Sequence, residues 1–128
     1  MLMYWSFFSS LFFLPVGACL YIHPTFPKVV AVLILAVGII SSFHHTRTYD
    51  EDFKDPIQML DLTLVGLLGA SLFYYFHTHF LYWIFSVGAG FIKYKLCSFD
   101  QCEEQSLWHA FFHLFCAMGV LCLGVVTP

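Results

Sequence analysis

The chain has 128 residues, of which 60% are hydrophobic, 20% aromatic and only 10% charged, and its mean hydropathy is +0.81. Soluble domains are usually about 25% charged, so this composition predicts a membrane protein. The length fits one domain over residues 1–128, and the net charge of −3 gives no basic surface of the kind that binds nucleic acid.

Five apolar stretches are long enough to cross a bilayer, which takes roughly 20 residues of helix. The first stretch has no basic region before it, which favours a retained helix over a signal peptide. Pro56 falls where a helix can begin, because the first turn does not need that N–H. We therefore expect an all-α integral membrane protein, a bundle of about five transmembrane helices over residues 4–22, 27–46, 56–76, 79–95 and 106–126.

Small residues cluster in three of these stretches, and such residues let membrane helices approach one another closely. We expect close helix contacts at Gly66, Gly69 and Ala70, at Gly88, Ala89 and Gly90, and at Ala117 and Gly119.

The five cysteines are odd in number and lack zinc-ribbon spacing. We interpret most of them as packing residues rather than as disulfide partners or metal ligands. They are Cys19, Cys97, Cys102, Cys116 and Cys122.

Lysine and arginine positions predict the orientation in the membrane, because these residues accumulate on the cytoplasmic side. Arg47 and Lys54 follow the second stretch, and Lys93 and Lys95 end the fourth, whereas only Lys28 belongs to the opposite face. The N-terminus and both charged loops are therefore predicted to face the cytoplasm or its topological equivalent, with the C-terminus across the membrane.

Three polar positions interrupt the apolar stretches: Ser41 with His45, Asp61, and His109 with His113. Threading the five spans in order places all three at one face of the membrane, at depths that agree within roughly 10 Å. Among the Asp, Glu, Lys and Arg side chains, Asp61 alone lies well inside a predicted span. A carboxylate inside a membrane is costly, which marks it as a functional candidate.

The spacing of these residues suits a metal site. Residues four apart share a helix face, so His109 and His113 can point at one ligand, and Ser41 lies one turn from His45. Three neutral imidazoles and a water form a common catalytic arrangement for Zn²⁺. A nearby carboxylate can orient that water or take its proton, and a serine can donate to an oxyanion.

Each pattern also has a structural interpretation. A single H-x-x-x-H pair is a weak signal, His44 and His45 suit a membrane interface, and Asp61 suits a hydrogen bond between helices. His44 could also take the place of His45 at a metal. By contrast, His77 and His79 fall in a loop on the opposite face and are expected to be interfacial.

Three motifs together resemble the CREST superfamily of seven-span membrane proteins, which includes alkaline ceramidases and the progestin and adipoQ receptors. They are S-x-x-x-H from Ser41 to His45, an isolated aspartate at Asp61, and H-x-x-x-H from His109 to His113. In that family the motifs fall on the second, third and last spans, in this order. This chain has five predicted spans, so two helices between the aspartate and the last span are missing.

The resemblance implies that His45, His109 and His113 bind zinc, with Asp61 and Ser41 around its water, and that the protein hydrolyses a lipid amide such as ceramide. The expected partners are membrane lipids, a lipid substrate and other proteins within the membrane, without nucleic acid. The main alternative is a non-catalytic accessory subunit of a larger membrane complex. Haem held by one histidine of each helix is a third interpretation, but it leaves Asp61 unexplained.

Overall fold

A computed structural model describes residues 7–44, 56–97 and 107–127, without the side chains of residues 44, 95–97 and 107–109. This part of the chain is helical and contains no strand, so the all-α prediction is confirmed. The helices lie close to the five predicted ranges, and the third has the predicted bounds. They are α2 (Phe13–Ile22), α3 (Lys28–His44), α4 (Pro56–Phe76), α5 (Phe80–Phe91), its π-helical continuation η1 (Ile92–Cys97), and α6 (Leu107–Val126).

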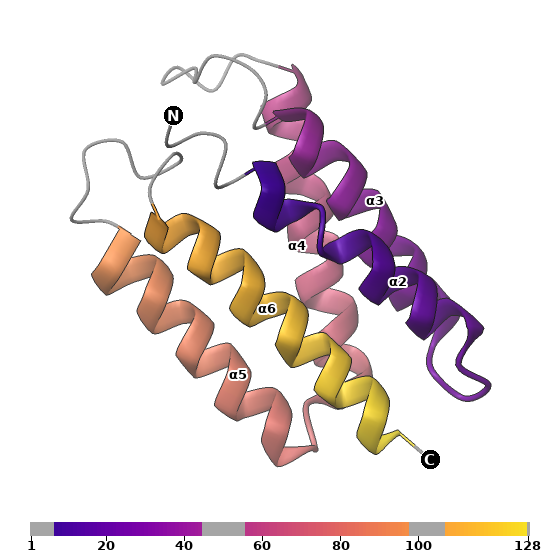
Figure 1. The fold of residues 1–128 in the computed structure, drawn as a ribbon. Helices are drawn as coiled ribbons and strands as arrows, with labels where there is room; N and C mark the ends of the chain where they lie inside the picture. The colour runs from indigo at the N-terminus through magenta and orange to yellow at the C-terminus, as the bar shows by residue number, and fades with distance from the viewer. Residues whose placement is uncertain (1–6, 45–55, 98–106, 128) are drawn as a thin grey trace.

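A break precedes α2 and separates it from a short helical segment at residues 7–10, visible in the indigo ribbon of Figure 1. Pro15 explains the break, because its nitrogen cannot donate to the carbonyl of Leu11 and its ring crowds that oxygen. The Leu11 carbonyl instead accepts from the N–H of Leu14, at 3.1 Å, which tightens the turn. The segment that carries Ser9 and Ser10 is therefore separate from α2.

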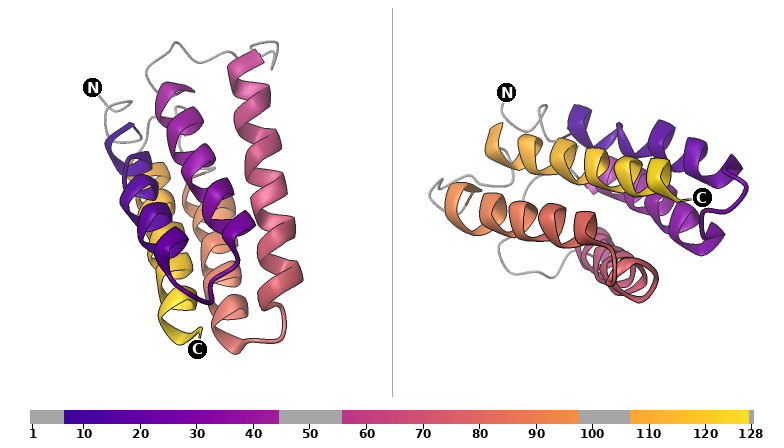
Figure 2. Two further views of the ribbon diagram at one scale, coloured as in Figure 1. Left: turned by 90° about the vertical axis from the view of Figure 1, so that its right-hand side faces the viewer. Right: turned by 90° about the horizontal axis from the view of Figure 1, so that it is seen from below.

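The helices form two antiparallel pairs and one further helix (Figures 1 and 2). Helix α2 packs along α3, and α5 packs along α6; α6 also contacts α2, and α4 lies against α3. The end of α3 and the starts of α4 and α6 lie at one end of the bundle, which we call the α3–α4 end. The opposite end, with the turn from α4 to α5, is the α4–α5 end.

The apolar core lies between α2, α3, α4 and α6. Its largest fully buried side chain, Phe26, stacks on Phe76 with ring centroids 5.6 Å apart. Helix α5, in contrast, has no buried residue and lies at the edge of the bundle. The core residues are Phe13, Leu20, Phe26, Val30, Ala31, Ile34, Val37, Leu68, Phe76, Ala117, Val120 and Leu123.

Helices α2 and α3 pack closely because each has a glycine facing a bulky residue of the other. A Cβ atom added to Gly17 would lie 2.8 Å from Cγ of Leu35, and one added to Gly38 would lie 3.0 Å from Cδ2 of Leu14. Both distances are too short for ordinary contacts. The pair is therefore held by reciprocal fits of a leucine over a glycine.

Helices α5 and α6 repeat this arrangement with phenylalanines. A Cβ atom at Gly88 would lie 2.6 Å from Phe115, and one at Gly119 would lie 2.9 Å from Phe85. The two rings also contact each other, with centroids 5.2 Å apart. The predicted close contacts at Gly88 and Gly119 are confirmed.

The same prediction is wrong at Gly66, Gly69 and Gly90. A Cβ atom at any of these positions would meet nothing within 4 Å. On α4 the reason is its place at the edge of the bundle, where the face that carries Gly66 and Gly69 has no neighbouring helix among the described residues. A close contact that the sequence did not suggest occurs instead at Gly124 of α6, under Leu20 of α2.

Candidate functional site

Polar side chains are buried at the α3–α4 end of the bundle. Burying a polar group without a hydrogen bond costs free energy, so each buried polar side chain is expected to have a hydrogen-bond partner or a functional role. All the buried polar side chains within the described ranges lie at this end. They are Ser9, Ser10, Ser41, Ser42, Gln58, Asp61 and His113.

His113 lies in the second turn of α6 and is only 8% exposed. Its Nδ1 atom is 2.9 Å from Oγ of Ser9, which is itself 4% exposed. The imidazole also packs against Phe13 in a T-shaped arrangement, with ring centroids 6.0 Å apart. The ring is thus held on one side by a hydroxyl and on another by the first residue of α2.

A second polar contact joins the N-terminal segment to α3. Oγ of Ser10 and Oγ of Ser42 are 3.0 Å apart, Ser10 is 2.7 Å from the carbonyl of Phe7, and Ser42 is 2.5 Å from the carbonyl of Gly38. Each hydroxyl has one proton, so the two serines can fill two of these three hydrogen bonds at a time. Together with the Ser9–His113 contact, they connect α3 to α6 through residues 7–10.

The serine and the aspartate predicted to act in catalysis are both buried. Ser41 lies in the last turn of α3 next to Ser42, and Asp61 lies in the second turn of α4. Gln58 is one turn before Asp61 and is also buried, and its Oε1 has no hydrogen-bond partner among the described residues. A buried acceptor of this kind is expected to receive a hydrogen bond from a donor such as a water or a bound polar group.

Two of the three predicted zinc ligands are not described. His45 lies outside the described residues, and His109 belongs to α6 but its side chain is not described. Among the described side chains, no group of three His, Cys, Asp or Glu residues could hold a metal ion. His113 alone of the predicted ligands can be placed, so the three-histidine site stays a prediction.

The histidines expected at the opposite interface do lie at the α4–α5 end. His77 is exposed, with its Nδ1 2.9 Å from the carbonyl of Phe73. His79 caps α5, because its Nδ1 accepts from the N–H of Leu81 at 3.1 Å. Neither belongs to the polar group around His113.

Sequence reasoning singled out Ser41, Asp61 and His113 but missed the serines that contact them or their neighbours. One sequence feature could have identified them: each of the first two apolar stretches contains two consecutive serines, Ser9–Ser10 and Ser41–Ser42. Serines at similar depth in adjacent antiparallel helices are well placed to hydrogen-bond across the helix interface.

Comparisons of the chain with protein-family models, with curated proteins and with solved structures give no match. The resemblance to the CREST superfamily thus depends on the three sequence motifs.

Proposed function

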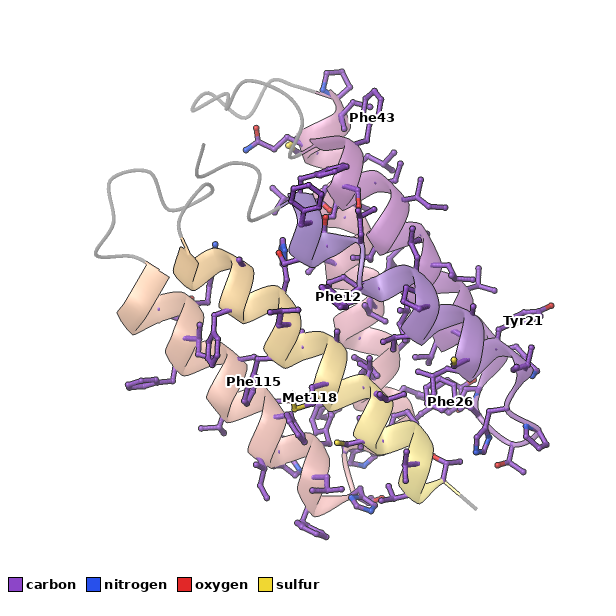
Figure 3. All side chains as sticks on the ribbon, viewed as in Figure 1. Phe12, Tyr21, Phe26, Phe43, Phe115 and Met118 are labelled. Atoms are coloured by element: carbon purple, nitrogen blue, oxygen red, sulfur yellow. The ribbon has the colours of Figure 1, made fainter. Side chains whose placement is uncertain are left out.

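We propose that the chain is an integral membrane protein whose α3–α4 end forms a zinc-dependent site for the hydrolysis of a lipid amide such as ceramide. The membrane assignment is supported by the distribution of side chains, because polar residues are buried and large apolar residues are exposed, the reverse of the usual pattern in soluble proteins. Serine, aspartate and histidine are buried, whereas Phe43, Ile39 and Met118 are each more than half exposed. Figure 3 shows sticks that are almost entirely carbon around the outside of the bundle. An extensive apolar surface of this kind suits contact with lipid.

Helix length gives a second argument. Helix α4 has 21 residues and is apolar enough to cross a membrane. At 1.5 Å per residue it is about 31 Å long, close to the thickness of a bilayer's hydrocarbon core. The other apolar helices, as far as they are described, are shorter: Phe7–Ile22, Lys28–Phe43, Phe80–Tyr94 and Ala110–Val126.

Aromatic residues at the α4–α5 end suit a membrane–water interface, where tryptophan and tyrosine are enriched. Tyr74 and Tyr75 near the end of α4 are exposed, and Trp83 donates its indole N–H to the carbonyl of His77 at 2.6 Å. Lys28, at the start of α3, lies over the ring of Tyr21 and donates to the backbone carbonyls of Tyr21, in the last turn of α2, and of His23.

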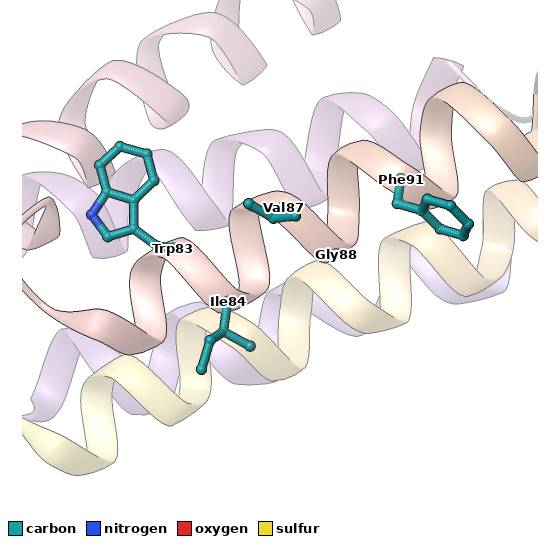
Figure 4. Close-up of a pocket in the computed structure, with 5 residues that line it drawn as sticks. All are labelled: Trp83, Ile84, Val87, Gly88 and Phe91. Carbon is teal, nitrogen blue, oxygen red and sulfur yellow. The ribbon is translucent and has the colours of Figure 1, made fainter.

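The exposed face of α5 is apolar as well. A shallow depression of about 620 Å³ runs along it, lined by Trp83, Ile84, Val87, Gly88 and Phe91 (Figure 4). It carries no ionisable side chain, so it suits the tail of a lipid rather than chemistry.

The membrane proposal predicts which loops share a side. In a cysteine-free background of the full-length protein in sealed vesicles, single cysteines replacing Thr48 and Ser98 should react with an impermeant maleimide from one side. A cysteine replacing Thr78 should react only from the other. Labelling of positions 48 and 98 from opposite sides would rule out the five-span threading. Labelling of all three positions from one side would rule out spanning by α4 and α5.

The hydrolase proposal depends mainly on one observation. His113, the last residue of the H-x-x-x-H motif, is buried and hydrogen-bonded at the end of the bundle where Asp61 and Ser41 are also buried. Lipid-facing histidines would have argued against a metal. The donor set also fits, because neutral imidazoles are common zinc ligands. We propose His45, His109 and His113 as the residues that hold Zn²⁺.

Zinc supplies Lewis acidity that makes water a nucleophile near neutral pH. Asp61 would accept the proton of the attacking water, and Ser41 would donate a hydrogen bond to the oxyanion that develops on the amide carbonyl. The proton then passes to the leaving nitrogen as the C–N bond breaks, which releases a fatty acid and an amine. The buried oxygen of Gln58, one turn from Asp61, would accept a hydrogen bond from water or from the substrate.

The alternative is an accessory subunit, and the serine contacts between helices favour it as well, because they would also serve packing alone. Metal content and turnover of the same purified protein decide between the two. We expect about one zinc per chain and release of fatty acid from a ceramide in mixed micelles. Protein without metal or turnover would favour the accessory subunit, and a Soret absorption band would favour haem.

A further inference from the structure

We propose that Ser9 is the positioning residue that selects the tautomer of His113 and thereby directs Nε2 of that histidine to the metal. The inference rests on the proposed function and adds a residue that the sequence motifs do not contain. Its basis is the 2.9 Å contact between Oγ of Ser9 and Nδ1 of His113, in which both side chains are buried.

The chemistry of a neutral imidazole makes this contact informative. One ring nitrogen carries the proton and the other carries the lone pair, and only the nitrogen with the lone pair can bind a metal. We infer that Nδ1–H of His113 donates to Oγ of Ser9, which leaves the lone pair on Nε2; the opposite direction, from the serine hydroxyl to Nδ1, would put the proton on Nε2. Ligating histidines commonly donate their second nitrogen to a neighbouring acceptor, which fixes the ring and its tautomer.

The surroundings of His113 strengthen the argument. The imidazole makes a T-shaped contact with Phe13 at the start of α2, which restricts how the imidazole can turn. Ser9 lies in the segment that Pro15 separates from α2. The axis of α2 therefore does not fix the orientation of this segment, or of the Ser9 hydroxyl against α6. A tautomer chosen in advance would avoid the cost of moving the proton when metal binds.

The tautomer can be measured in the metal-free, full-length protein with ¹⁵N-labelled histidine, because protonated and unprotonated ring nitrogens have well-separated resonances. The resonances of His113 are assigned by their loss in His113→Gln. At a pH where the ring is neutral, the wild-type protein should show Nδ1–H. Ser9→Ala should shift His113 toward Nε2–H, whereas Ser9→Thr, which keeps a hydroxyl, should retain Nδ1–H.

Zinc affinity gives the second readout. Ser9→Ala should weaken zinc binding by roughly 10–100-fold, the usual effect of removing a partner of a metal ligand. Ser10→Ala is the matched control, because Ser10 is a neighbouring buried serine that bonds to Ser42 rather than to His113. It should leave the tautomer and the affinity unchanged.

Three results would overturn the inference: Nε2–H on His113 in the wild-type protein, an unchanged tautomer in Ser9→Ala, or equal losses of zinc affinity in Ser9→Ala and Ser10→Ala. Failure of the proposed function is a different result. It would appear as wild-type protein that binds no zinc, whatever the tautomer of His113.

Discussion

Replacing Asp61 with asparagine should lower the hydrolysis of a lipid amide by roughly 10²–10⁴-fold while most of the zinc remains bound. Asparagine has nearly the same size and can still hydrogen-bond, but it cannot accept a proton at neutral pH. Asp61 is proposed to act on the attacking water rather than to hold the metal. The substitution should therefore lower the rate of hydrolysis without releasing the zinc. The measurement is zinc content and initial rate on the same preparation.

Asp50→Asn provides the control for this experiment. It makes the same change of charge in the predicted loop between the second and third spans, and its turnover should equal that of the wild-type protein. Full turnover in Asp61→Asn would refute the assignment of the base even if zinc is present. Loss of zinc from Asp61→Asn would instead make Asp61 a ligand.

His113→Ala should lose metal and activity together. Zinc should fall from about one per chain to nearly none, because a lost ligand costs more than the roughly 10–100-fold associated with a lost partner of a ligand. The substitution also removes a buried side chain, so His113→Gln is needed beside it to retain most of the volume. Both variants should be compared with the wild-type protein by thermal unfolding in the absence of zinc.

The best control for His113 is His77→Ala rather than His79→Ala. His77 is exposed at the α4–α5 end, whereas the side chain of His79 caps α5, and losing such a cap typically costs about 1 kcal/mol. His77→Ala should bind zinc and turn over substrate as the wild-type protein does. A His113 variant that folds and keeps its zinc would remove this histidine from the ligand set.

The positions of the helices could be predicted from the sequence because length, apolarity and proline fix them locally. Helix α4 begins at Pro56 and ends at Phe76, as expected. The bounds of a helix are properties of that helix alone and need no knowledge of its neighbours. Asp61 and His113, which the sequence marked as candidates because they interrupt apolar stretches, are both buried in the structure.

Contacts between helices could not be predicted in the same way, because they depend on how each helix is rotated about its axis. Gly66 and Gly69 form as clear a small-residue pattern as Gly88, yet they face open space and Gly88 receives Phe115. The partner of His113 was missed for the same reason. Ser9 is 104 residues away in the chain, and nothing in the local sequence indicates that the two side chains face each other.

The two glycine-matched helix pairs bear on the order in which the site assembles. Each pair is formed by neighbours in sequence, α2 with α3 and α5 with α6, so each can close as a hairpin on its own. The candidate residues are divided among these units: Ser41 belongs to the first hairpin, His113 to the second, and Asp61 to α4 between them. Neither hairpin contains a complete site. The proposed chemistry would therefore require both hairpins and α4 together, and the Ser9–His113 contact can form only where the second hairpin lies against the N-terminal part of the first.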